Sequence, residues 1–117
     1  VACPTMQTTN DMPIARPESF ATLGLVRFQV NAHYFEGATW VRTSDNTFTE
    51  HFGETRDDRL REYHEVNDLP VVGLREGSYL RCIDESIALI GGGARVFLCG
   101  QPPMDIEPGA DLSSLPW

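Results

Sequence analysis

The feature that most constrains the fold is a strand–helix–strand pattern in the middle of the chain. Apolar and polar residues alternate in LGLVRFQVN, which predicts a strand over residues 25–30. Residues 55–66 have helical spacing, with Thr55 and Asp58 placed as a capping pair, and LPVVGL predicts a buried strand at residues 71–74. Strands joined through a helix run parallel, so the sequence predicts an α/β fold built on a parallel βαβ unit.

Three short β-like segments follow this unit, at residues 79–83, 86–90 and 94–99. The run Gly91–Gly93 between the second and the third is typical of a hairpin turn, so we expect an antiparallel β meander. The stretch from residue 33 to 53 carries several aromatic residues without a sustained period, which predicts a long loop. Aromatic side chains in such a loop favour a lid or a dimer contact.

Length, charge and cysteine usage restrict the class of protein. A chain of 117 residues suffices for one domain, and no apolar run approaches the roughly 20 residues of a membrane span. The formal net charge of −8 argues against nucleic acid or an anionic membrane as the main partner. The three cysteines have neither metal-ligand nor disulfide spacing, which favours a cytoplasmic protein. His51 and His64 could join a third histidine at a metal ion, but their irregular spacing argues against a metal site.

A candidate catalytic pair follows the two parallel strands. His33 comes just after the first strand and Glu76 just after the second. Ligands of open α/β sheets bind beyond the carboxyl ends of the strands, and neighbouring strands lie about 4.8 Å apart, so an imidazole and a carboxylate could meet there. A carboxylate that accepts the Nδ1 proton of a histidine is the orienting half of a hydrolytic triad. The alternative is that both side chains are ordinary solvated loop residues.

Arg56 lies in the first turn of the predicted helix, where a cation opposes the helix dipole. A helix N-terminus with an arginine beside it offers backbone donors and a guanidinium fork, which together fit a carboxylate. The sequence therefore predicts a local receptor for an acidic group in an acidic chain. The alternative is a surface arginine paired with Asp57 or Asp58.

A resemblance to a known family is carried by four stretches, in this order: ACPTMQTTNDMPI, QVNAH, GETRDDRLRE and GLREGSYL. They resemble the second half of peptidase E, the α-aspartyl dipeptidase family. The resemblance implies a three-layer fold similar to class I glutamine amidotransferases, which is flavodoxin-like, and removal of an N-terminal aspartate from Asp-X dipeptides. It implies His33 as the general base, either Glu76 or Asp11 as the acidic member of the triad, and Arg56 as the residue that holds the substrate aspartate. It also implies a homodimer, and neither a metal nor a cofactor is expected.

The family's nucleophilic serine sits in a GWSAGAN-like elbow that immediately precedes the residue matching Val1. We therefore expect residues 1–117 to be the C-terminal portion of a single domain, active as a serine peptidase only with an N-terminal half that carries the elbow. Two departures bear on specificity, because Ala32 replaces the family's usual proline and the stretch from His33 to Gly53 is longer than in the family. The open alternatives are a cyanophycinase-like hydrolase of other aspartyl peptides and a non-catalytic aspartate-binding fragment.

Overall fold

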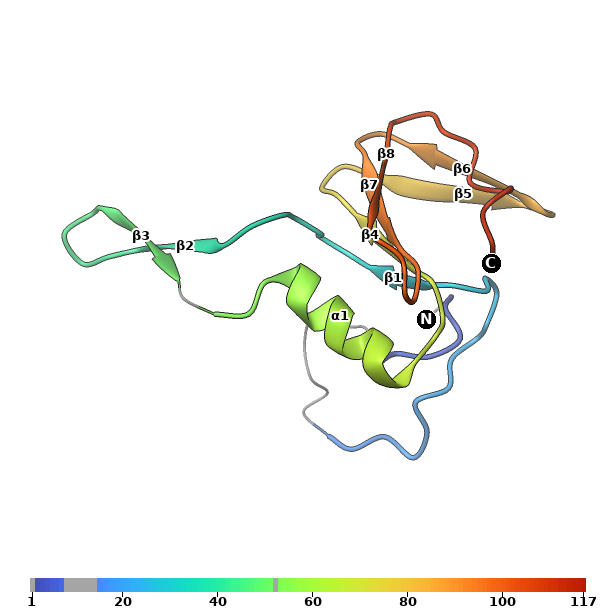
Figure 1. Cartoon of the computed structure of the whole chain (residues 1–117), viewed down its shortest axis with the longest axis horizontal. Helices are drawn as coiled ribbons and strands as arrows, with labels where there is room; N and C mark the ends of the chain where they lie inside the picture. Colours follow the sequence, from blue (N-terminus) through green and yellow to red (C-terminus); the bar gives the residue numbers. More distant parts are fainter. Residues whose placement is uncertain (1, 8–14, 52) are drawn as a thin grey trace.

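A four-stranded sheet in the order β1-β4-β7-β8 forms the centre of the computed structural model, which describes residues 2–7, 15–51 and 53–117 (Figure 1). Two further two-stranded sheets, β2-β3 and β5-β6, complete the described strands. The elements are β1 (Gln29–Asn31), β2 (Thr39–Arg42), β3 (Phe48–His51), α1 (Arg56–Val66), β4 (Val71–Leu74), β5 (Tyr79–Ile83), β6 (Ser86–Ile90), β7 (Ala94–Phe97) and β8 (Met104–Ile106).

The predicted parallel βαβ unit is present. β1 pairs parallel with β4, with Gln29 opposite Val71 and Asn31 opposite Gly73, and α1 lies between them in the chain. The first strand is shorter than predicted, because the backbone N–H groups of Leu25 and Val26 donate to the carbonyl of Ala2 instead of to β4. The chain is thus a mixed α/β fold that is compatible with a flavodoxin-like arrangement.

The expected β meander is divided between two sheets. β5 and β6 form the predicted antiparallel hairpin, but β7 pairs antiparallel with β4 and β8. The run Gly91–Gly93 is therefore not a hairpin turn, since it carries the chain from one sheet to the other. Gly91 has a φ of 90°, and a Cβ atom there would lie 2.1 Å from the carbonyl oxygen of Gly77. Glycine is needed at this position because the backbone crosses the β4–β5 connection at close range.

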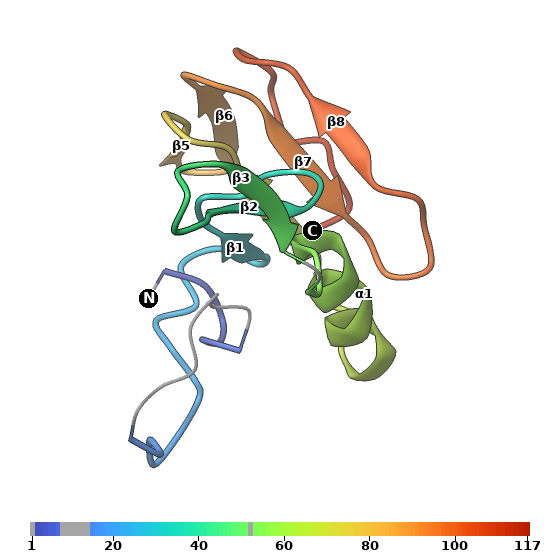
Figure 2. The same ribbon diagram turned by 90° about the vertical axis from the view of Figure 1, so that its left-hand side faces the viewer.

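The two faces of the central sheet bury separate clusters. Val71 and Val72 point to opposite faces, as neighbouring residues of a strand must. Val71 packs with Leu60 of α1 and with Phe97, whereas Val72 packs with Leu89 of the β5-β6 hairpin. Figures 1 and 2 show α1 and the β5-β6 hairpin on opposite sides of the sheet. This layering presents the N-terminus of α1 near the end of β1.

A hairpin of β2 and β3 occupies the stretch for which the sequence predicts a loop. It extends away from the central sheet in Figure 1, and every residue of both strands is exposed. Trp40 is 62% and Phe48 is 66% exposed, so no buried face imposes the alternation by which strands are recognised. The sequence signal for this hairpin lies in its turn, where residue types that favour turns occur. There the backbone N–H of Thr43 donates to the carbonyl of Thr47, and Asn46 has a φ of 69°.

Helix α1 begins at the predicted capping pair. The Thr55 side chain accepts the backbone N–H of Asp58, and the Asp58 carboxylate accepts the N–H of Thr55 in return. Hydrogen bonds from the Thr55 side chain and backbone, and from Arg61, lower the pKa of Asp58 to about 2. Within the described residues, α1 is the single helix, and its length and polarity rule it out as a membrane span.

Candidate active site

His33 and Glu76 contact each other beyond the carboxyl ends of β1 and β4. Nδ1 of His33 lies 2.6 Å from Oε2 of Glu76, so the predicted proximity of these two side chains is confirmed. The carboxylate can only accept, which means that Nδ1 donates the proton. In the neutral imidazole with this tautomer, Nε2 carries the lone pair that can take a proton from a nucleophile. Both side chains are open to their surroundings, with 72% and 82% of their surface exposed.

The backbone after each strand aims the two side chains at each other. His33 has a φ of 53°, a left-handed conformation that L-residues adopt at a cost of about 1–2 kcal/mol. The chain returns to the sheet at once, because Tyr34 donates its backbone N–H to the carbonyl of Leu74 at 2.8 Å. Glu76 lies in a turn closed by the N–H of Ser78 and the carbonyl of Arg75, and this turn has Gly77 at a φ of 74°. His33 is thus displaced from a ladder that continues on both sides of it.

The residue after His33 connects the candidate catalytic pair to helix α1. The Tyr34 hydroxyl donates to the Asp57 carboxylate at 2.6 Å, and the ring is 2% exposed, with its centroid 5.6 Å from that of Phe97. Burial, and after it the hydrogen bond to Asp57, raises the pKa of the Tyr34 hydroxyl. The phenol therefore stays protonated and continues to donate. Sequence reasoning did not identify this contact, because a tyrosine next to the candidate base has no spacing signal.

Gly73 makes room for Tyr34. A Cβ atom at Gly73 would lie 2.7 Å from Cγ of the Tyr34 ring, closer than real Cβ contacts allow. We expect Gly73→Ala to lower the free energy of unfolding of the complete protein by about 1–3 kcal/mol, measured by urea denaturation, because the buried ring must shift. The same substitution in a Tyr34→Ala background should cost much less. Equal costs in the two backgrounds would show that the ring is not what Gly73 accommodates.

Glu36 fixes the other end of the segment that begins at His33. Its carboxylate accepts from Arg75 at 3.0 Å and pairs with Arg95, whose side chain is 17% exposed. Asp105 of β8 accepts from Arg75 at 2.7 Å and completes the cluster. Since Arg75 directly follows β4, and Arg95 and Asp105 belong to β7 and β8, the segment that begins at His33 is fixed to the sheet at its other end.

Arg56 stands over the ring of Phe35, with its guanidinium carbon 4.9 Å from the ring centroid. It also lines an open cavity of about 310 Å³ at the N-terminus of α1, where the other lining residues are Phe35, Gly37, Thr39, His51, Gly53, Glu54, Thr55 and Arg59. The lining of this recess thus includes the cationic side chains of Arg56 and Arg59, and the receptor for an acidic group stays a prediction. The residues from His33 to Glu36 join this recess to the candidate catalytic pair.

Asp11, the other candidate for the acidic member of the triad, lies outside the described residues. The contact between His33 and Glu76 is the histidine–carboxylate pair that the described part of the chain provides. The choice between the two carboxylates stays a prediction.

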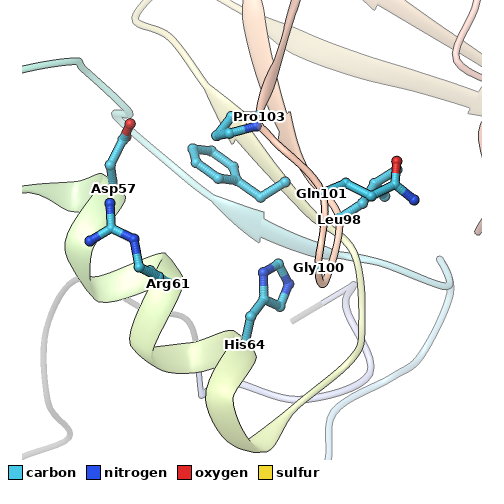
Figure 3. A pocket seen from close by; sticks show the side chains of 8 residues that line it. Asp57, Arg61, His64, Leu98, Gly100, Gln101 and Pro103 are labelled. Carbon is cyan, nitrogen blue, oxygen red and sulfur yellow. The ribbon is translucent and has the colours of Figure 1, made fainter.

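A second cavity, of about 320 Å³, lies between α1 and the β7–β8 connection (Figure 3). His64 projects from the helix toward this connection, and Arg61 of the same helix also lines the cavity. Nε2 of His64 lies 3.0 Å from the carbonyl oxygen of Leu69, which indicates a structural contact. The cavity contains none of the predicted site residues. Over residues 2–7, 15–51 and 53–117, no three His, Cys, Asp or Glu side chains are grouped as metal ligands.

Comparison with known proteins identifies a family and several relatives of this chain. The model of a family described as peptidase family S51 matches residues 1–90. Peptidase E of Streptomyces coelicolor is 49% identical over 98% of this chain and 44% of its own length. A probable alpha-aspartyl dipeptidase of Drosophila melanogaster is 41% identical, and peptidase E of a Nostoc species 42% identical, each over 98% of this chain and 45% of its own length. The chain thus spans less than half the length of these relatives.

Proposed function

Because this chain belongs to peptidase family S51, we propose that the complete protein is a serine-type dipeptidase that hydrolyses Asp-X dipeptides through an acyl-enzyme. The observation that carries the proposal is the 2.6 Å contact of His33 Nδ1 with Glu76 Oε2 at the carboxyl ends of two parallel strands. The names of the relatives, peptidase E and probable alpha-aspartyl dipeptidase, support the substrate class. A cytoplasmic location and a homodimer stay predictions from the sequence.

The proposed chemistry begins at a serine nucleophile, which the proposal assigns to a part of the complete protein outside the 44–45% of the relatives' length that this chain matches. Nε2 of His33 takes the hydroxyl proton while the serine oxygen attacks the peptide carbonyl. The same nitrogen then gives that proton to the leaving amine, and water hydrolyses the ester with His33 again as the base. Glu76 holds the imidazole in the Nδ1–H tautomer and stabilises the imidazolium that forms in each step.

Arg56 supplies the selection for aspartate. A guanidinium can donate two parallel N–H groups to a side-chain carboxylate, and the positive end of the α1 dipole adds positive potential. The contact with the Phe35 ring, 4.9 Å from the guanidinium carbon to the ring centroid, favours this position of the guanidinium. A neutral side chain at the same position would leave this cationic recess without its anion.

The experiment that tests the function compares Asp-Leu, Ala-Leu and a β-linked aspartyl dipeptide as substrates of the complete protein. Turnover of Asp-Leu well above the other two is the expected result. Preference for the β-linked peptide would instead indicate a cyanophycinase-like specificity. Binding of aspartate with no turnover of any peptide would indicate a non-catalytic binding protein.

We expect Arg56→Ala to lower kcat/KM for Asp-Leu by about 100-fold while changing the rate with Ala-Leu little, because a bidentate charged pair is lost. Arg56→Lys should recover part of the loss, since the charge remains without the fork. The matched control is Arg61→Ala, which removes an exposed arginine of the same helix that pairs with Asp58. An equal effect of Arg56→Ala and Arg61→Ala would assign the loss to the helix and not to the receptor.

A further inference from the structure

Glu54 introduces a negative charge into the cavity that contains Arg56. The described residues that line this cavity include the cationic side chains Arg56 and Arg59 and a single carboxylate, that of Glu54. A receptor for an anion alone gains nothing from a carboxylate in its wall, because the like charges repel each other. The presence of both positively and negatively charged side chains therefore indicates a ligand that carries charges of both signs.

The backbone at the start of α1 places the two opposite charges together. Thr55, the N-cap residue, is extended, with φ of −74° and ψ of 166°. In an extended segment, residues two positions apart point to the same side, and Glu54 and Arg56 accordingly line the same cavity. The capping box between Thr55 and Asp58 fixes this geometry.

The Glu54 carboxylate already has a cationic neighbour within the chain, the side chain of Arg59. Its Oε2 lies 3.6 Å from Nε of Arg59, beyond hydrogen-bond range, and both side chains are exposed. An exposed ion pair of this kind contributes at most about 1 kcal/mol. The pair is therefore weak enough for a bound ammonium group to replace it.

We propose that Glu54 accepts the α-ammonium group of the substrate and so restricts the site to aspartate with a free N-terminus. This assignment rests on the proposed function, which places the substrate aspartate on Arg56. In such a residue the carboxylate and the ammonium group lie three bonds apart, so a receptor needs one cation and one anion side by side. An internal or acylated aspartate would leave the Glu54 carboxylate against a neutral amide, without a cation to compensate for its desolvation. Glu54 thereby sets the removal of an N-terminal aspartate apart from cleavage after an internal or acylated aspartate.

The test uses two pairs of probes that differ in the amine. Binding of L-aspartate and of succinate, which lacks the amine, is measured by calorimetry on the complete protein. Turnover of Asp-Leu and of N-acetyl-Asp-Leu is measured alongside. We expect Glu54→Gln to weaken L-aspartate binding and to lower kcat/KM for Asp-Leu, each by about 10- to 100-fold. Succinate binding should weaken by less than threefold. Glu62→Gln, an exposed glutamate of α1 outside the cavity, is the matched control and should keep the wild-type preference for L-aspartate.

The outcomes separate the two proposals. Loss of the preference for L-aspartate over succinate in Glu54→Gln, even in a protein that turns over no peptide, supports the role of Glu54 and counts against the proposed dipeptidase function alone. Turnover of Asp-Leu by the wild type, with an unchanged preference for the free amine in Glu54→Gln, overturns the role of Glu54 and leaves the dipeptidase function standing. Equal weakening of L-aspartate and succinate would also overturn it, because Glu54 would then act through the structure of the cavity.

Discussion

His33→Ala in the complete protein is expected to lower kcat/KM for Asp-Leu by about 10⁴-fold or more. Without the imidazole, no group takes the proton of the nucleophile or returns it to the leaving amine, so both halves of the reaction are slowed. The loss should appear in kcat, while KM changes little, because the proposed aspartate receptor at Arg56 consists of other side chains. Steady-state kinetics with Asp-Leu measure both quantities.

Stability provides the control for this variant. The His33 side chain is 72% exposed, so its removal takes no packing contact from the core. The free energy of unfolding should therefore change by less than about 1 kcal/mol. A variant that retained more than a few per cent of the wild-type kcat would exclude His33 as the general base. A variant with a strongly reduced stability would assign the loss of activity to folding.

The contact between His33 and Glu76 could be predicted from the sequence because one physical rule connects pattern to position. Two runs of apolar residues joined through a helix must lie parallel, so residues just after each run meet at the same sheet edge. The structure adds what this rule does not contain. The left-handed φ at His33 and the turn at Gly77 decide that the two side chains touch.

Two parts of the fold could not be predicted, for different reasons. The β2-β3 hairpin has no buried face among the described residues, so burial left no period in its sequence. The crossing at Gly91 depends on the carbonyl of Gly77, a contact between distant segments that glycine spacing does not encode. The periodicity of apolar residues indicates which residues face a core. It therefore carries no information about an exposed hairpin or about a close crossing of two backbone segments.

The contacts of Tyr34, Phe35 and Glu36 were also missed, and they make the site a single unit. The neighbouring side chains of Tyr34 and Phe35 both contact the first turn of α1, whereas Glu36 contacts Arg75, so the segment follows no helical or strand period. Tyr34 reaches Asp57 in the first turn of α1, Phe35 lies under Arg56, and Glu36 pairs with Arg75. The position of the proposed base and that of the proposed aspartate receptor are thereby set by one short stretch of chain.

The second large effect is expected for Glu76→Gln, which should lower kcat for Asp-Leu by about 10²- to 10⁴-fold with little change in KM. A glutamine at this position keeps the size of the side chain but can offer its NH₂ group to Nδ1, which favours the tautomer with the proton on Nε2. His33 could then no longer accept the proton of the nucleophile, and the negative charge that stabilises the imidazolium would be lost. Asp11→Asn is the decisive comparison, because it makes the same chemical change at the rival carboxylate. Near-normal kcat in Glu76→Gln together with a large loss in Asp11→Asn would assign the acidic member of the triad to Asp11, and the contact with Glu76 would then be a surface ion pair.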